Sequence, residues 1–355
     1  MSIKLKPLDQ QTIVITGATS GIGLATARAA AKAGAKLVLA ARSAGDLETV
    51  ARELGGQVAT VVADVADPAA VAQIAETART RFGGFDTWVN NAGVGMWGKI
   101  EQTQLDDAKK LYDTNLWGVF NGSLEAVKHL KQHGGALINL GSVASDVGLP
   151  IQGLYASSKH AIKGVTDALR IELANEKAPV SVTLIKPAAI NTPFPAHARN
   201  YLPEQPTLPP PVYAPEEVAD AILYAATHPV RDVYVGGGGK IMSTLNKYAP
   251  GTLDWLAAKG ADPKNQVKPG TRAQNPEGSL YRPAGPRGKA HGDYEGHTMK
   301  SFYTRTTLHP VVAGLVAATT LGTTIALLAA RKKASGAAPA KTQASYEPLT
   351  PASNE

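Results

Sequence analysis

Two residues four positions apart, Tyr155 and Lys159, could together handle a proton. They lie in a segment with helical patterning, so they share a helix face. An ammonium group beside a phenol would lower the pKa of the phenol from about 10 toward neutral pH. Such a phenol can exchange a proton with an alcohol or carbonyl oxygen. Ser142 ends an expected strand 13 positions earlier, where its hydroxyl could hydrogen-bond the same oxygen and stabilise its charge.

A tyrosine and a lysine at this spacing usually lie on an ordinary helix surface. A glycine-rich segment near the N-terminus favours a catalytic role for this pair. Residues 16–23 read TGATSGIG and stand between a β-branched run and a helical pattern. Glycines at a strand-to-helix turn let the backbone approach a pyrophosphate, which then meets unpaired N–H groups and the positive end of the helix dipole. In this setting the segment predicts a dinucleotide site.

The choice of dinucleotide is indicated at residues 40–43, which read AARS. An acidic residue at this position would bind the adenosine ribose hydroxyls and repel a 2′-phosphate, whereas Arg42 would pair with that phosphate. The sequence therefore favours NADP(H) and leaves NAD(H) open. The alternative is that Arg42 is a solvated residue at the start of a helix.

Short apolar runs alternate with longer helical patterns over the first 235 residues, which is typical of repeated βαβ units. The expected strands are Thr12–Thr16, Lys36–Ala41, Gln57–Val62, Phe85–Val89, Ala136–Leu140, Val180–Ile185 and Asp232–Val235. The expected helices include Ile22–Ala33, Ala69–Arg81, Leu105–His133 and Leu154–Asn175. We expect an α/β fold: a doubly wound parallel sheet of seven strands with helices on both faces.

The spacing T-G-x-x-x-G-x-G resembles that of the short-chain dehydrogenase/reductase family, and other motifs of that family follow in order. They are Asp64, the NNAG element at 90–93, Asn115, the Ser142, Tyr155 and Lys159 set, and the PAAINT element at 187–192. The resemblance covers about residues 8–240 and implies a Rossmann-type domain. Ala188 replaces the glycine of the last motif, which could shift that loop while leaving Thr192 in place.

The resemblance also assigns roles to residues. The implied catalytic residues are Ser142, Tyr155, Lys159 and Asn115, with Asn115 holding a proton-relay water. The implied cofactor-binding residues are Gly17, Thr19, Ser20, Gly21, Ile22, Gly23, Arg42, Asp64, Val65, Asn91, Ala92, Gly93, Tyr155, Lys159, Pro187, Ile190 and Thr192. Relatives usually pair through the helices that carry Asn115 and Tyr155, so a homodimer or homotetramer is expected.

We therefore expect an NADP(H)-dependent oxidoreductase that interconverts a carbonyl and an alcohol, with Tyr155 as proton donor or acceptor. One alternative is a non-catalytic NADP(H)-binding scaffold or sensor, which would not need the proton-transfer residues. Another is an NAD-dependent epimerase or dehydratase, which uses a Tyr and a Lys at this spacing. Its usual glycine pattern and long nucleotide-sugar domain are absent from this sequence.

The proline-rich stretch from Pro193 to Pro215 cannot be regular helix or central strand. It follows the sixth expected strand, where a lid over an active site is expected, with a plain surface loop as the alternative. Its aromatic and aliphatic residues are Phe194, Tyr201, Leu202, Leu208 and Tyr213. This composition favours a fairly apolar small-molecule substrate.

The chain has no cysteine, which excludes disulfides, thiolate metal sites and a thiol nucleophile. The histidines at 197, 228, 291, 297 and 309 show no metal-ligand spacing, so we expect no metal and interpret them as surface or loop residues. Met1–Gln11 contains no apolar run of signal-peptide length, which favours a cytoplasmic catalytic domain.

The basic character of the chain belongs to its C-terminal third. Residues 1–235 hold 21 Lys and Arg against 22 Asp and Glu, and residues 236–355 hold 15 against 7. We find no folded basic face or aromatic interleaving there, so no nucleic-acid partner is expected. The expected divisions are a catalytic domain at 1–239, a helix at 240–260 within a Gly/Pro-rich linker region at 240–310, a membrane segment at 311–330 and a polar tail at 331–355.

The expected membrane segment, 311–330, holds 20 residues without a charge and is followed by Arg331-Lys332-Lys333. As a helix it would cross a hydrocarbon layer of about 30 Å. The alternative is a buried or interfacial helix, because four threonines and many alanines weaken its hydrophobicity. We expect the segment to attach the catalytic domain to a membrane.

Overall fold

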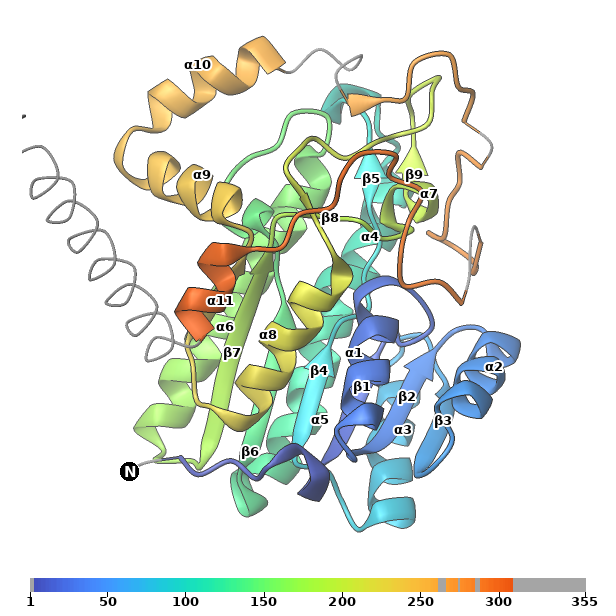
Figure 1. The fold of residues 1–355 in the computed structure, drawn as a ribbon, viewed down its shortest axis with the longest axis vertical. Helices are drawn as coiled ribbons and strands as arrows, with labels where there is room; N and C mark the ends of the chain where they lie inside the picture. The colour runs from blue at the N-terminus through green and yellow to red at the C-terminus, as the bar shows by residue number, and fades with distance from the viewer. Residues whose placement is uncertain (1–2, 261–265, 274, 285–287, 309–355) are drawn as a thin grey trace, which may run out of the picture. The chain divides into compact units, whose positions relative to one another are not determined.

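A parallel sheet of seven strands forms the centre of the protein (Figure 1). The computed structural model describes residues 3–260, 266–273, 275–284 and 288–308. The strands are β1 Thr12–Thr16, β2 Lys36–Ala41, β3 Val58–Val62, β4 Thr87–Asn90, β6 Gly135–Leu140, β7 Val180–Pro187 and β11 Asp232–Val235. Their order is β11-β7-β6-β4-β1-β2-β3, and all neighbours are parallel. The predicted α/β class and seven-stranded sheet are confirmed.

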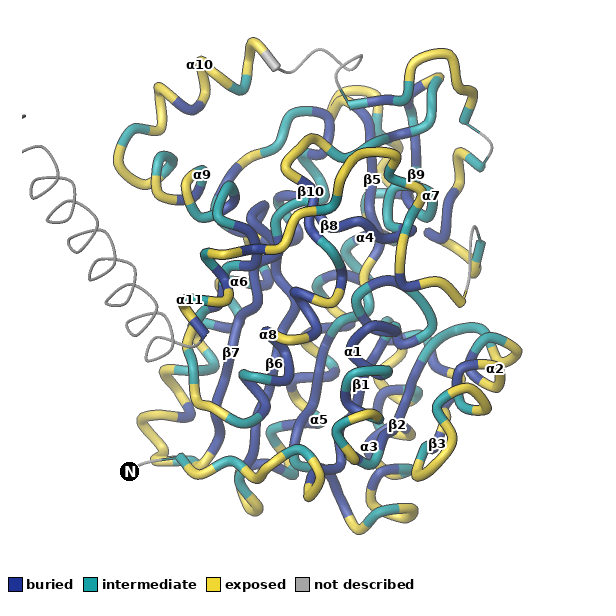
Figure 2. The backbone as a smooth tube through the Cα atoms, viewed as in Figure 1, coloured by how far each residue is buried: buried dark blue, intermediate teal, exposed yellow. Residues whose placement is uncertain are grey.

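Helices cover both faces of this sheet because successive strand residues point to opposite sides. Ile13 and Ile15 of β1 pack with helices α1 (Gly21–Lys32), α2 (Ala44–Leu54) and α8 (Pro215–Thr227). Val14, between them, packs on the other face with α3 (Pro68–Phe82), α5 (Gly118–His133) and α6 (Gly153–Asn175). Figure 2 shows the central strands as buried and the outer sides of the helices as exposed.

Local signals in the sequence set several helix starts. Ser43 accepts a hydrogen bond from the Asp46 N–H at the start of α2, and Asp67 caps α3 by accepting from the Ala69 N–H at 2.9 Å. Pro68 and Pro215 occupy the first positions of their helices, where the missing N–H would have no partner within the helix. These starts fix where each strand ends and its loop begins.

The predicted helix Leu105–His133 is interrupted. The structure has α4 at Leu105–Tyr112, one π-helical turn at Asp113–Trp117, and then α5. The predicted helix at 240–260 is likewise two helices, α9 Gly237–Tyr248 and α10 Pro250–Gly260. Pro250 explains the second break, because proline cannot donate a helical hydrogen bond and disfavours helical backbone at Ala249 before it.

The described residues of the segment expected to be a linker belong to the same compact unit as the sheet, Met1–Leu308. Within it α11 (Phe302–Leu308) joins α8 through an Arg305–Glu217 ion pair of 2.6 Å, and the Thr304 hydroxyl accepts from the Gly236 N–H. A Gly- and Pro-rich sequence lacks hydrophobic periodicity, so composition alone could not reveal that its backbone groups find partners on the domain.

The predicted membrane segment, 311–330, and tail, 331–355, lie outside the described residues. Within the part of the chain that the structure describes, no helix is both long enough and apolar enough to cross a bilayer.

Candidate active site

A cavity of about 670 Å³ lies at the carboxyl ends of the strands. All seven parallel strands end at this edge, so the residues that follow β1, β2, β4, β6 and β7 meet there. Every predicted cofactor-binding residue lines the cavity except Gly23, and so do Ser142, Tyr155 and Lys159. Gly23 and Asn115 are buried and do not line the cavity.

The turn after β1 leaves no room for a side chain at Gly17 or Gly23. Gly17 and Gly21 have φ angles of +65° and +54°, which favour glycine. A Cβ on Gly23 would lie 2.2 Å from the Gly17 carbonyl oxygen and 2.5 Å from Asn91 Nδ2. That amide donates to the carbonyls of Thr16 and Gly17 at 2.9 and 3.1 Å, so the residue that follows β4 holds the turn in place.

Gly23→Ala is expected to destabilise the fold by about 1–3 kcal/mol, because the new methyl group must displace backbone and not a flexible side chain. It should also weaken dinucleotide binding, since the turn carries the N-terminus of α1. Urea unfolding and nucleotide titration would measure both effects. Gly45→Ala is the control: its Cβ meets nothing within 4 Å, and stability should be unchanged or slightly higher. Equal behaviour of the two variants would contradict the packing argument.

Tyr155 and Lys159 project from the first turns of α6, and Ser142 lies two residues after the end of β6. The Lys159 Nζ lies 5.7 Å from the centroid of the Tyr155 ring. Ser142 hydrogen-bonds the Tyr155 hydroxyl, and its own Oγ accepts from the Ala144 N–H at 3.1 Å. The three side chains are therefore grouped around one point of the cavity wall.

The electrostatics of this group differ from the prediction made for it. Burial raises the pKa of Tyr155 to about 12, which the Ser142 hydrogen bond only partly offsets. Burial also lowers the pKa of Lys159 to about 8, and its Nζ donates to the Leu140 carbonyl at 2.8 Å. The expected lowering of the phenol pKa was wrong for this arrangement, because removal of the hydroxyl from water outweighs the nearby ammonium group.

Asn115 lies in the π-helical turn and is fully buried. Its Oδ1 accepts from the Val94 N–H at 2.8 Å, and its Nδ2 donates to the Val94 carbonyl and the Ser158 hydroxyl at 3.0 and 3.1 Å. The side chain thus ties α6 to the segment after β4. The widened turn at this position is the kind of helix irregularity that often occurs at functional sites.

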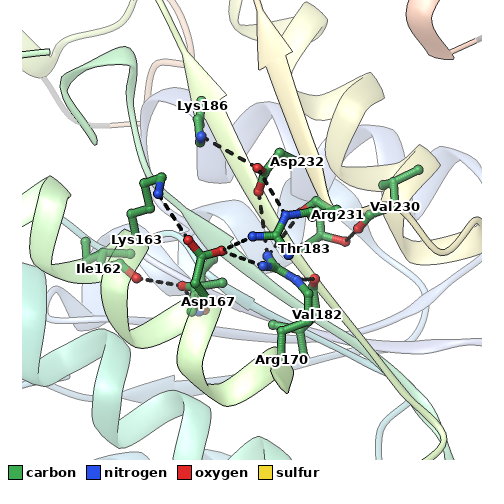
Figure 3. Close-up of polar contacts among 12 residues, drawn as sticks. Ile162, Lys163, Asp167, Arg170, Val182, Thr183, Lys186, Val230, Arg231 and Asp232 are labelled. Atoms are coloured by element: carbon green, nitrogen blue, oxygen red, sulfur yellow. Dashed lines mark hydrogen bonds and ion pairs between the residues drawn. The ribbon is translucent and has the colours of Figure 1, made fainter. Parts of the chain in front are cut away.

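A charged cluster anchors the far half of α6 to the edge of the sheet (Figure 3). Asp167 accepts hydrogen bonds from Lys163, Arg170 and Arg231 at 3.1, 2.6 and 2.8 Å. Arg170 also donates to the Val182 carbonyl of β7 at 2.9 Å. The helix that carries Tyr155 and Lys159 is therefore fixed at two places, at Ser158 and over residues 163–170.

Arg42 stands at the other end of the cavity, beside Asp64. Burial lowers the pKa of Arg42, while the charge of Asp64 raises it. Its guanidinium group is partly buried and donates to the carbonyls of Ser279 and Leu280. This differs from the solvated residue considered as the alternative for Arg42.

Several cavity residues had not been identified from the sequence. The cavity is also lined by Phe194 and Leu208 of the predicted lid. The lining residues that had not been identified are Trp97, Gln152, His197, Ser279, Pro283 and Ala284. His197 had been interpreted as a surface or loop residue. No motif marks the residues after 266, and only the three-dimensional course of the chain brings them to the cavity.

Comparison with known proteins gives three informative results. A family model described as short chain dehydrogenase matches residues 11–201. The chain is 45% identical over 325 residues to the uncharacterized oxidoreductase YxnA of Bacillus subtilis, covering 89% of this chain and 90% of that one. Two solved structures align with TM-scores of 0.57 and 0.58.

The first of these structures is an alcohol dehydrogenase from Thermococcus sibiricus complexed with 5-hydroxy-NADP, 29% identical, with 63% of this chain and 95% of that one covered. The second is a 3-ketoacyl-(acyl-carrier-protein) reductase from Brucella melitensis complexed with NADH, 28% identical, with 65% and 99% covered. More than a third of this chain lies outside each structural match, whereas about a tenth lies outside the match to YxnA.

Proposed function

This chain belongs to the short-chain dehydrogenase family, and on that premise we propose that it is a nicotinamide-dependent oxidoreductase that interconverts a carbonyl and an alcohol. The observation that carries the proposal is one continuous cavity. It runs from Arg42 and the glycine turn to Ser142, Tyr155 and Lys159. A non-catalytic binding protein would need the end with Arg42 and the glycine turn, but not the end with the Ser142, Tyr155 and Lys159 set.

The cavity suits a dinucleotide. Side-chain-free backbone at Gly17 and Gly21 and the N-terminus of α1 suit a pyrophosphate, and Arg42 and Asp64 suit an adenosine group. A bound nicotinamide would supply or accept the hydride. The residues of this chain then have to orient the substrate oxygen and move one proton to or from it.

Tyr155 is suited to donate that proton. With a pKa of about 12 its hydroxyl stays protonated at neutral pH, so it can give a proton to the oxygen of a carbonyl under reduction. Ser142 hydrogen-bonds the same hydroxyl and can donate to the same oxygen. Lys159 keeps much of its positive charge at pH 7 and would stabilise the phenolate left behind. These pKa directions favour carbonyl reduction at neutral pH.

The direct test is to incubate the full-length chain with NADPH or NADH and panels of carbonyls and alcohols, and to follow the absorbance of the reduced nicotinamide. Turnover of apolar carbonyls is expected, because Trp97, Leu149, Phe194, Leu208 and Met242 line the substrate end. Turnover restricted to small hydrophilic sugars would contradict the proposed substrate class. Binding without any turnover would favour the sensor or scaffold alternative.

We propose that NADP(H) is preferred because Arg42, and no acidic residue, follows β2. Arg42→Ala is expected to lower the preference for NADPH over NADH by about tenfold to a hundredfold, the value of one or two charge-assisted hydrogen bonds. Fluorescence titration with both nucleotides would measure it. Arg52→Ala is the matched control, since Arg52 is an exposed arginine on α2. A wild-type chain that binds NADH as tightly as NADPH would refute the preference.

We also propose self-association through the helices that carry Asn115 and Tyr155. Apolar side chains are exposed on these helices: Trp117 at 51%, Leu124 at 46% and Ile171 at 65%. Exposed apolar residues grouped on neighbouring helices are typical of interfaces. Size-exclusion chromatography with light scattering would give the oligomeric state, and a strictly monomeric chain would reject this proposal.

Membrane attachment through residues 311–330 stays a prediction from the sequence. Fractionation of cells that express the full chain, followed by carbonate and detergent extraction, would test it. Recovery of the chain without detergent would count against attachment.

A further inference from the structure

Described residues that follow α10 line the cavity at the end where Arg42 lies. They run, orange to red in Figure 1, past α7 (Phe194–His197) and β9 (Arg199–Asn200) and return over β8 (Ala189–Ile190) to α11. Ser279, Pro283 and Ala284 from this segment line the same cavity as Arg42, Asp64 and the glycine turn. We call the described residues 275–284 and 288–292 the strap.

Backbone hydrogen bonds fasten the strap on both sides of the cavity. On one side the Ser279 N–H donates to the His197 carbonyl at 2.7 Å, and the Asn200 N–H donates to the Pro276 carbonyl at 2.8 Å. On the other side, at the glycine turn, the Gly288 N–H donates to the Thr19 carbonyl at 3.2 Å. The Gly21 N–H donates to the Lys289 carbonyl at 3.0 Å. The described residues of the strap are therefore hydrogen-bonded to the segment after β8 on one side and to the glycine turn on the other.

Side chains anchor it between these points. Leu280 is fully buried among Val94, Met96 and Leu111. The next residue, Tyr281, donates its hydroxyl to Asp107 at 2.6 Å. Asp107 is 3% exposed and also accepts from Tyr201 at 2.5 Å and from Arg199, so one carboxylate joins the strap to the predicted lid.

The strap also orients Arg42 without neutralising it. The two carbonyls of Ser279 and Leu280 accept hydrogen bonds from the two terminal nitrogens of the guanidinium group. Carbonyls carry no net charge, so the cation keeps its attraction for an anion, and the guanidinium group has five N–H donors in all. A fixed, partly buried arginine whose hydrogen-bond acceptors on the strap are neutral can still attract a phosphate, although the nearby charge of Asp64 opposes that attraction.

We propose that the strap completes the dinucleotide site, so that a bound cofactor leaves only after the strap detaches. The proposal rests on the proposed function and adds residues to the cofactor site that the family core does not supply. The match covers nearly the whole of each solved structure, yet it leaves more than a third of this chain unmatched. The match to YxnA, by contrast, includes most of this chain. Ser279, Pro283 and Ala284 of the strap line the same cavity as Arg42 and the glycine turn, so the strap forms part of its wall.

The test is the rate at which bound NADPH dissociates from the full chain, followed by stopped-flow fluorescence with excess NADP⁺ as the chase. Leu280→Ser removes the buried anchor and should raise the dissociation rate at least tenfold. Tyr281→Phe removes one hydrogen bond and should raise it a few-fold. Both variants should also speed association. Tyr248→Phe is the matched control, because Tyr248 is 74% exposed on α9, and its rates should equal those of the wild type.

Each of the other outcomes would reject either the strap proposal or the proposed function. Unchanged dissociation in both folded variants, checked by thermal melting, would reject the strap as a cover. Faster association with unchanged dissociation would make it a competitor for the site, which also rejects the proposal. A wild-type chain that binds neither NADPH nor NADH would refute the proposed function itself. Should Leu280→Ser fail to fold, Tyr281→Phe and trypsin cleavage after the exposed Lys289, which bound NADPH should slow, decide the question.

Discussion

Tyr155→Phe is expected to lower kcat for carbonyl reduction by about 10²–10⁴-fold, the usual contribution of a positioned general acid. The variant loses one oxygen and keeps the ring, which packs against Phe194 at a centroid distance of 5.4 Å. The shape of the cavity should therefore be preserved. Steady-state kinetics on any substrate that the wild type converts would measure the loss, and nucleotide titration should give nearly unchanged affinity.

A structural role for the hydroxyl would produce a different pattern. If the hydroxyl only supported folding, Tyr155→Phe would lower the melting temperature and the affinity for nucleotide together. Tyr112→Phe is a suitable control, because it also removes a single hydrogen bond between a tyrosine and a serine, here Tyr112 and Ser157 at 2.7 Å. That variant should retain most of its activity. Full activity of Tyr155→Phe would refute the proposed mechanism.

The fold was predictable because its signals are local. Strands such as Thr12–Thr16 and Lys36–Ala41 are apolar runs of strand length, and their observed bounds are the predicted ones. The same holds for the glycine turn, whose Gly17 and Gly23 are required by contacts within the βαβ unit and with the end of β4. Sequence periodicity and motif spacing report this kind of short-range constraint well.

The part of the cavity wall that comes from residues after 266 could not be predicted, because long-range contacts place these residues there. Ser279 reaches Arg42 across 237 positions in the chain, through a backbone carbonyl that any residue type would provide. The break at Asp113–Trp117 also depends on tertiary contacts, since the side chain of Asn115 there bonds to the backbone of Val94. The pKa of Tyr155 differed from the prediction for a similar reason: spacing on a helix says nothing about burial.

Lys159→Met is expected to abolish most activity and yet stabilise the cofactor-free protein. Lys159 is 6% exposed, and burial lowers its pKa from 10.5 to about 8, so the fold is destabilised whenever this lysine is charged. A pKa change of that size corresponds to about 3 kcal/mol at neutral pH. Loss of the hydrogen bond to the Leu140 carbonyl offsets about 1 kcal/mol of the gain. Urea unfolding at pH 7 should therefore show a net gain of about 1–2 kcal/mol.

The pH dependence of that gain identifies its cause. Below pH 8 both the folded and the unfolded chain hold the proton on Lys159, so the buried ammonium group destabilises the fold by its full amount. Between pH 8 and 10.5 only the unfolded chain binds it, so the stability of the wild type should rise with pH and the advantage of Lys159→Met should fade. Lys163→Met, one turn further along α6, removes a half-exposed lysine paired with Asp167 at 3.1 Å. It should change stability by less than about 1 kcal/mol.

These measurements separate two roles for Lys159. A structural lysine would, on removal, weaken the fold at every pH at which it is charged. A lysine that destabilises the fold while its ammonium group lies beside the Tyr155 ring has its use in the chemistry of the cavity, where a positive charge supports a phenol that must give up its proton. Loss of activity together with a pH-dependent gain in stability would therefore assign the lysine to the reaction, whereas loss of both would assign it to the fold.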